Sequence, residues 1–490
     1  MIFFVSPLSI VLLSVFIVAV LIIFCKKLRN VNKLPVDGLQ KPPTPFKFPI
    51  IGHMHLLAGY SVPYEAFSNL GRKYGNVVKL QLGNVKCVVV NGQKNIREAL
   101  ITKGHHFDSR PNFERYQMLF GGNKENSLAF CDWSDTQKLR RDMLKVHTFP
   151  RSFTNTYYSL DNLIQQASTL IKSEITPNKS MEIKPIILKN CANIFTAHFC
   201  SKTFSVSDEK FIRMVENFDD IFYEVNQGYA ADFLPFLMPF HKKNLERINS
   251  LTHEIREFIL DEVVGSKFNV DTDVEGDYLD SLIKRVKTNS DLTWETALFA
   301  LEDIIGGHSA VGNFLIKLLA YLAKESEVQA KIQAEIDAKE KPVTICDRSS
   351  MPYTEATIFE AVRLIASPIV PRVANQNSSI NGYEIEKDTV LFLNNYDLSM
   401  SKALWNDPAK FKPERFLKNG KIVKPDYFLP FGGGRRSCMG YKIVQLVSFG
   451  ILSDILQNYT VLPDDGTSYE VPVGSLALPK NTFKFKFISR

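Results

Sequence analysis

The chain lacks the sequence patterns that mark several common classes of protein. Its seven cysteines are an odd number without a Cys-x-x-Cys pair, which favours reduced thiols over a secreted disulfide framework. Its nine histidines contain no His-Glu-x-x-His motif, which argues against a zinc enzyme. There is no dense block of lysine and arginine, and the net charge is only +7. Nucleic acid is therefore not an expected partner.

No evident linker interrupts the chain after residue 52. The chain has 490 residues, of which 45% are hydrophobic and 23% charged, and this is enough for a large buried core. Although length alone favours about three domains, we expect one catalytic domain over residues 53–490. Residues 26–52 are basic and proline-rich, which predicts a stiff hinge.

Residues 1–25 have the composition of a membrane anchor. Residues 2–24 carry no charged side chain, and a stretch of about 20 apolar residues is long enough to span a bilayer. Lysines and an arginine follow directly. Because positive residues stay on the cytoplasmic side, the remainder of the chain is expected to face the cytosol.

The middle of the chain shows mostly helical periodicity, with a few interruptions. Residues 63–74 predict a helix, and residues 77–82 and 86–90 predict a hairpin around Gly-Asn. Residues 105–132 predict a loop with one helical turn. Residues 267–278 predict an exposed loop.

A glycine-rich loop around one cysteine is the most specific feature of the sequence. Residues 431–440 read Phe-Gly-Gly-Gly-Arg-Arg-Ser-Cys-Met-Gly and precede an apolar run that suits a helix. Consecutive glycines remove side chains, so a flat ligand can approach the backbone closely. Arginines and a helix N-terminus favour the thiolate of Cys438, which makes it a good ligand for a soft metal. A buried structural cysteine is the alternative.

The spacing Phe-x-x-Gly-x-Arg-x-Cys-x-Gly resembles the haem-binding loop of the cytochrome P-450 superfamily of haem-thiolate monooxygenases. The resemblance implies a mainly α fold with a smaller β region, haem b as cofactor and an apolar substrate. Cys438 would be the proximal ligand of the iron. Phe431, Gly434, Arg436 and Gly440 would complete the haem-binding loop.

Two further arginines are expected, by the same resemblance, to join Arg436 at the haem propionates. These are Arg141 and Arg372, since guanidinium matches the geometry of carboxylate. Family members commonly place a tryptophan four residues before the basic residue, whereas this chain has Gln137 there. A solvated helix face is the alternative for the basic residues around Arg141.

A Glu-x-x-Arg pair and a later arginine strengthen the resemblance. Glu360 and Arg363 are three residues apart, which allows them to pair on one helix face. Pro-Glu-Arg415-Phe follows about fifty residues later, and the cysteine loop follows that. By resemblance, Glu360, Arg363 and Arg415 form a structural cluster behind the haem.

A long helix is predicted from Thr293, as N-cap, to about residue 323. Gly306 and Gly307 lie inside it and match the glycines of the family motif Ala/Gly-Gly-x-Asp/Glu-Thr, which places them against the haem. Two interior glycines cost about 1 kcal/mol each relative to alanine. Close approach of the haem explains them, and tight helix packing is the alternative.

The acid and the threonine of this motif are replaced by Ser309 and Ala310. Alanine has no hydroxyl, so the usual acid–alcohol pair for proton delivery is missing. His308 and Ser309 are the candidates for another water chain, since both exchange protons or hydrogen bonds. A haem-thiolate isomerase or dehydratase, which needs no external oxygen activation, and a non-catalytic haem- or sterol-binding membrane protein both stay open.

The resemblance also implies a substrate pocket and partners. The pocket would be lined by Ile304, Gly307, Ile369, Val370 and Leu476. Electrons would come from NADPH through a flavoprotein, the NADPH-cytochrome reductase. Its docking surface is expected to be a basic patch made of Lys138, Lys145, Arg435 and Lys442.

Two stretches resemble a particular group within the superfamily. Residues 306–313, without acid or threonine, and residues 431–442 look like the insect Spook/Spookier group of Halloween enzymes. This implies a sterol substrate, an early step of ecdysteroid synthesis after 7-dehydrocholesterol, and the endoplasmic reticulum membrane. The apolar tract 233–240 is either a buried connection or a loop that dips into membrane lipid.

Overall fold

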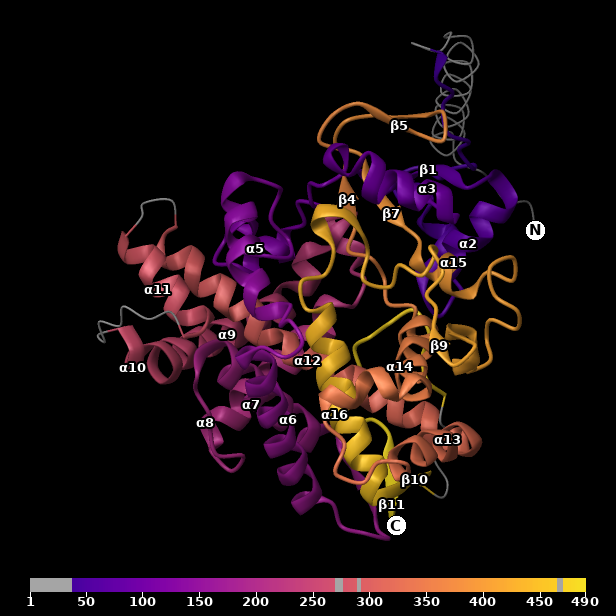
Figure 1. Ribbon diagram of the computed structural model, residues 1–490. Helices are drawn as coiled ribbons and strands as arrows, with labels where there is room; N and C mark the ends of the chain where they lie inside the picture. Colours follow the sequence, from indigo (N-terminus) through magenta and orange to yellow (C-terminus); the bar gives the residue numbers. More distant parts are fainter. Residues whose placement is uncertain (1–37, 269–275, 289–291, 465–469) are drawn as a thin grey trace, which may run out of the picture.

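The computed structural model describes residues 38–268, 276–288, 292–464 and 470–490, so the predicted anchor lies outside the described residues. The fold is mainly helical; the main sheet lies beside α2 (Pro63–Tyr74) and α15 (Asn395–Met400), whereas β10 (Tyr459–Pro463) and β11 (Lys484–Ser489) lie at the opposite end of the molecule, near the C-terminus (Figure 1). This agrees with the predicted fold class. The longer helices are α2 (Pro63–Tyr74), α5 (Asp135–Thr148), α6 (Asn155–Glu174), α7 (Lys184–Cys200), α8 (Glu209–Val225), α9 (Met238–Phe258), α11 (Tyr278–Thr288), α12 (Trp294–Lys324), α13 (Ser326–Asp337), α14 (Pro352–Ile365) and α16 (Tyr441–Asn458).

Short helices and strands complete the described part of the chain. The short helices are α3 (Gln93–Arg97), α4 (Glu114–Leu119), α10 (Gly265–Phe268) and α15 (Asn395–Met400). The strands are β1 (Val77–Leu82), β2 (Val85–Val90), β3 (Ser180–Glu182), β4 (Arg372–Val373), β5 (Ser378–Ile380), β6 (Tyr383–Ile385), β7 (Val390–Leu393), β8 (Leu417–Lys418), β9 (Lys421–Ile422), β10 (Tyr459–Pro463) and β11 (Lys484–Ser489).

The main sheet joins segments that lie far apart in the sequence. Its strand order is β1-β2-β7-β4, with β2 parallel to β7 and the other two pairs antiparallel. The predicted hairpin is confirmed, with Leu82 opposite Val85 across the Gly-Asn turn. Because β4 is the last strand, the sheet places Arg372 opposite Leu391 at its edge.

The long helix α12 runs through the centre of the helical region (Figure 1). The predicted cap is confirmed, because the Thr293 hydroxyl accepts a hydrogen bond from the N–H of Thr296. By length and composition α12 would also suit a membrane, but 83% of its apolar window is buried inside the protein. It is therefore the core helix around which α7, α8, α14 and α16 pack.

Three predictions for irregular segments can be compared with the structure. The segment 105–132 is mainly irregular, as predicted, with the short helix α4 and 3-10 turns. Tyr278 is fully buried at the start of α11, so the exposed loop predicted for 267–278 does not extend that far; residues 269–275 lie outside the described part. In the apolar tract, Leu234 is buried whereas Phe236 and Phe240 are 59% and 84% exposed. A fully buried connection is thereby excluded.

Candidate haem-binding site

The cysteine loop closes on itself just before α16. The N–H of Cys438 donates to the Phe431 carbonyl at 3.0 Å, and the N–H of Gly432 donates to the Leu429 carbonyl at 3.0 Å. Gly432 and Gly434 have φ values of +70° and +67°, which only glycine adopts readily. The loop therefore presents Cys438 at the N-terminal end of α16.

Gly434 is required by a contact within the protein. A Cβ atom at this position would lie 2.1 Å from the carbonyl oxygen of Leu100, in the helical turn that follows α3. The sequence suggested that the loop glycines admit a flat ligand. At Gly434 the neighbour that demands glycine is the backbone of Leu100. At Gly440, by contrast, a Cβ would meet nothing within 4 Å.

The Cys438 thiol is surrounded by protein yet keeps accessible surface. Burial raises the pKa of this thiol, while the N–H groups of Gly440 and Tyr441 and the Arg141 guanidinium act in the opposite direction. The helix N-terminus and one arginine thus act in the direction that the sequence predicts, but burial outweighs them and the net shift of the thiol pKa is upward. A metal ion ligated by the sulfur would deprotonate it outright.

Arg141, Arg372 and Arg436 form a cluster of positive charge beside this loop. Burial and the neighbouring guanidinium groups lower the pKa of Arg372 to about 9 and that of Arg141 to about 10. Within the described ranges, none of the three forms an ion pair with a carboxylate. In the same part of the chain, Nε and Nη1 of Arg372 and Nε of Arg436 are buried without a hydrogen-bond partner. Such unpaired buried donors indicate a missing anion.

Arg110 is a fourth member of the cluster that the sequence analysis missed. It is buried, and its Nη1 donates to the carbonyls of Val370 at 2.9 Å and Pro371 at 3.0 Å. Burial is the main cause that lowers the pKa of Arg110 well below the usual value, and the positive charges of Arg372 and Arg436 lower it further. No periodicity marks this residue in the sequence, because only the fold brings it beside the chain that leads into β4.

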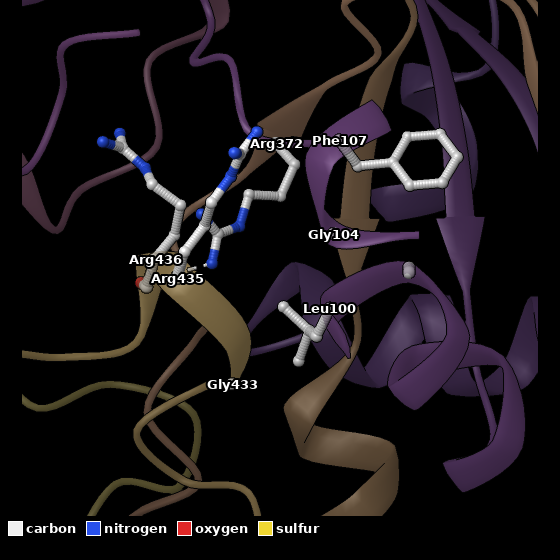
Figure 2. A pocket seen from close by; sticks show the side chains of 8 residues that line it. Leu100, Gly104, Phe107, Arg372, Gly433, Arg435 and Arg436 are labelled. Carbon is white, nitrogen blue, oxygen red and sulfur yellow. Dashed lines mark hydrogen bonds between the residues drawn. The ribbon is translucent and has the colours of Figure 1, made fainter. Parts of the chain in front are cut away.

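Figure 2 shows Arg372, Arg435 and Arg436 gathered at the Gly434–Arg436 turn. They border a narrow pocket whose other side carries Leu100 and Phe107. Leu100 and Phe107 come from the segment that follows α3, so the pocket lies between this segment and the cysteine loop.

Glu360, Arg363 and Arg415 meet as the resemblance implied. Glu360 is fully buried, and its Oε1 accepts hydrogen bonds from Arg363 Nη2 at 2.7 Å and Arg415 Nε at 3.2 Å. Its Oε2 accepts from Arg363 Nε at 2.8 Å, and Oε1 also accepts from the N–H of Lys412 at 2.9 Å. The cluster ties α14 to the turn around residues 412–415.

Comparison with known proteins identifies this arrangement. A family model for Cytochrome P450 matches residues 42–487. The chain belongs to the cytochrome P450 family. It is 37% identical to Cytochrome P450 307a1 of Drosophila melanogaster, over 93% of this chain and 91% of that protein. It is 29% identical to Steroid 17-alpha-hydroxylase/17,20 lyase of Ictalurus punctatus, over 96% and 93%. It is 26% identical to Cytochrome P450 1A2 of Mesocricetus auratus, over 91% of each chain.

Members of the cytochrome P450 family are monooxygenases that hold haem iron through a cysteine thiolate. The residues of this chain fit that cofactor. Cys438 supplies accessible surface, and Arg372 and Arg436, which keep buried donors without a partner and form no ion pair in the described ranges, suit the two propionates of a haem. The propionates would therefore supply the negative charge that the arginine cluster does not receive from the protein.

One face of α12 stays accessible in this P450, although the helix is buried from residue 311 to residue 323. Asp303, Gly306, Gly307 and Ala310 are all partly accessible and recur at helical spacing on one side. Asp303 Oδ2 accepts a hydrogen bond from the Ser127 hydroxyl at 2.9 Å, and burial raises the pKa of this carboxyl. The accessible face therefore carries an acid, but no hydroxyl at position 310.

Helix packing gives its own reason for the two glycines of α12. A Cβ at Gly306 would lie 2.9 Å from the ring of Phe218 on α8, and one at Gly307 would lie 2.9 Å from the ring of Phe195 on α7. Both distances are shorter than real Cβ contacts. The packing alternative therefore accounts for both positions, and their contact with haem stays a prediction.

His308 and Ser309 face the helices behind α12. Both are fully buried. The His308 ring lies edge-on to Phe218 with its Nδ1 2.7 Å from the Ile305 carbonyl, and burial lowers its pKa to about 4. The Ser309 hydroxyl is 3.4 Å from His308 Nε2. These contacts are structural, so the predicted role of the two residues in proton delivery has no support in the geometry.

The two arginines of α5 are held by contacts inside the protein, whereas Lys138 of the same helix is exposed to solvent. Arg141 Nη2 donates to the Ser437 carbonyl at 2.6 Å, next to Cys438. Arg140 is buried and donates from Nη1 to the Asn126 carbonyl at 2.7 Å. Gln137, at the expected tryptophan position, is also buried, and its Nε2 donates to the Leu128 carbonyl at 2.7 Å.

The predicted substrate residues come from three segments, namely α12, the chain before β4 and residues 472–479. Ile304 is buried in α12, whereas Val370 and Leu476 are half-buried. A Cβ at Gly432 would lie 3.9 Å from Ile369 Cγ2, so this isoleucine packs against the loop. Their contact with a substrate stays a prediction.

Proposed function

We propose that this P450 is a membrane-anchored monooxygenase of the endoplasmic reticulum that oxidises a sterol in an early step of ecdysteroid synthesis. The observation that carries the haem-dependent part is the accessible Cys438 beside two arginines whose guanidinium groups keep buried donors without a partner. A thiolate and an anion-binding cluster in one place are what a haem with two propionates needs.

When bound, the haem supplies the redox chemistry that activates oxygen. The Cys438 thiolate, at the N-terminal end of α16, would hold the iron and donate electron density to it. Arg141, Arg372 and Arg436 would orient the group through its carboxylates and offset their charge. Ala310 presents only a methyl group on the accessible face of α12.

The sterol and the pathway rest on resemblance. Residues 306–313 and 431–442 look like the Spook/Spookier group. One relative is an insect P450, and another is named as a steroid hydroxylase. The predicted pocket residues Ile369, Val370 and Leu476 are all aliphatic, which would suit a flat apolar substrate.

Two exposed apolar loops support a membrane-facing surface around the β1–β2 turn. The N–H of Gly83 donates to the Ile51 carbonyl at 3.2 Å, and the N–H of Asn84 donates to the Phe233 carbonyl at 2.9 Å. This turn therefore joins both loops. Their exposed apolar side chains are Phe46, Phe48, Ile50, Phe236 and Phe240. Exposed apolar side chains on segments that meet at one turn suit membrane lipid, and the predicted anchor precedes this region in the chain.

The proposed electron donor is an NADPH-dependent flavoprotein reductase. Lys138 and Lys145 are exposed on α5, and Lys442 is half-buried at the start of α16. Arg435 pairs with Asp108 and lies 4.6 Å from the Trp133 ring. The three lysines therefore carry most of the free charge of this proposed patch.

The experiment is co-expression with a flavoprotein reductase and mass spectrometry of sterol products, starting from 7-dehydrocholesterol. Wild type is expected to give an NADPH-dependent product and the ferrous–CO Soret band of thiolate-ligated haem. Cys438→Ala is expected to lose both. Cys346→Ala is the matched control, because this free cysteine lies elsewhere and should leave both unchanged. A thiolate band that survives in Cys438→Ala would refute the ligand assignment.

Ala310 favours one alternative, a haem-thiolate isomerase or dehydratase that needs no external oxygen activation. Neither Ala310 nor the buried Ser309 offers a hydroxyl on the accessible face of α12. This alternative predicts product from the sterol in the absence of NADPH and reductase. An absolute dependence on NADPH would exclude it.

A further inference from the structure

The irregular segment 472–479 is held by polar side chains of helices. In the described part of this segment no residue belongs to a strand. Buried backbone groups need hydrogen-bond partners. Here they find them on α7 and α12, and at the C-terminal end of α14, where Gly474 N–H donates to the Ile365 carbonyl at 2.7 Å.

Lys317 on α12 holds the first half of the segment. Its side chain is fully buried, and its Nζ donates to the Pro472 carbonyl at 3.0 Å and to the Ser475 carbonyl. Among the described residues no carboxylate forms an ion pair with it. Burial accordingly lowers the pKa of this amine to about 7. A lysine kept in the core without a counter-charge is costly, and its two contacts are both with this segment.

A closed ring of hydrogen bonds holds the second half. Asn313 Oδ1 accepts from the N–H of Leu478 at 2.9 Å, and its Nδ2 donates to Asp219 Oδ1 at 2.8 Å. Asp219 Oδ2 pairs with Lys184 Nζ at 2.6 Å, and the same amine donates to the Leu478 carbonyl at 3.0 Å. The ring therefore begins at the N–H of Leu478 and ends at the carbonyl of the same residue.

The two sets of contacts bracket Leu476. Lys317 holds residue 475, and the ring around Asn313 holds residue 478, so the backbone on both sides of Leu476 is attached to α12. We propose that Lys317 and Asn313 are positioning residues that set the place of Leu476 and thereby the shape of the substrate pocket. The pocket part of this inference rests on the proposed function, whereas the attachment of the segment does not.

Hydrogen–deuterium exchange of the haem-loaded protein tests the attachment. Lys317→Met keeps the length of the side chain and removes its donors, so amide exchange in residues 474–478 is expected to rise about tenfold. Lys189→Met is the matched control. This partly buried lysine of α7 pairs with Glu174 at 3.1 Å, away from the segment, and should leave that exchange unchanged. Asn313→Ala provides the same test should Lys317→Met fail to fold.

Spectral titration with two azoles tests the pocket. The large probe 4-phenylimidazole is expected to bind Lys317→Met about threefold more weakly than wild type, while imidazole binds both equally. A general structural defect would weaken both probes. Unchanged exchange in residues 474–478 would overturn the positioning role, and unchanged 4-phenylimidazole binding would overturn the link to the pocket. A wild-type protein without the thiolate Soret band would instead refute the proposed function, and the exchange result would still stand.

Discussion

Replacing Glu360 with glutamine is expected to lower the free energy of unfolding by about 3–5 kcal/mol. The carboxylate has no exposed surface and accepts four hydrogen bonds, three of them from Arg363 and Arg415. Glutamine keeps the shape but removes the charge, and its amide group meets guanidinium donors. Two arginines are then left without their counter-charge, one of them fully buried.

Urea unfolding of the haem-loaded protein, followed by circular dichroism, measures this loss. Glu262→Gln is the control, because Glu262 pairs with Lys210 at 2.8 Å on the surface, and exposed pairs contribute little. The ferrous–CO spectrum should also show a smaller fraction of thiolate-ligated haem in Glu360→Gln, since the cluster supports the chain that leads into the cysteine loop. If Glu360→Gln lost no more stability than Glu262→Gln, the structural role of the cluster would be refuted.

Three further substitutions test single contacts. Gly434→Ala forces a Cβ against the Leu100 carbonyl at a φ of +67°, so most of the protein should lose the thiolate Soret band, whereas Gly228→Ala, outside the cysteine loop, should keep it because a Cβ there meets nothing within 4 Å. Gly307→Ala should lower the free energy of unfolding by about 1–3 kcal/mol through overpacking against a phenylalanine of α7, measured by urea titration. Burial lowers the pKa of Lys317 from 10.5 to about 7, so the unfolded chain binds more protons between these values and stability rises with pH there. From pH 7 to pH 10 the stability of wild type relative to Lys317→Met should grow on the order of 3 kcal/mol, and a constant difference would contradict the shift.

Features that depend on near neighbours in the chain were predictable. The β1–β2 hairpin forms around Gly-Asn, and Thr293 caps α12, because turn and cap preferences act over a few residues. The cysteine loop was predictable for the same reason, since Gly432 and Gly434 adopt positive φ values within one short segment.

Contacts between distant segments were not predictable from these patterns. Arg110 gave no signal, because the two carbonyls that accept from its Nη1 are some 260 positions away. His308 was a candidate for proton delivery, and only the packing of α8 shows that its ring is buried against Phe218. Helical spacing gives the angle between residues around α12, but it does not say which side meets which neighbour.

By itself the sequence determined the family, the cysteine and the absence of an acid–alcohol pair on α12. All three follow from which residues stand at closely spaced positions, and this does not depend on how the chain packs. The tertiary structure alone decided which charges are buried together and which lack partners. The arginine cluster, the attachment of residues 472–479 by Lys317 and the reason for Gly434 all depend on backbone from one segment lying against side chains of another. Burial makes these contacts matter for the free energy of folding, because polar groups removed from water must find partners inside the fold.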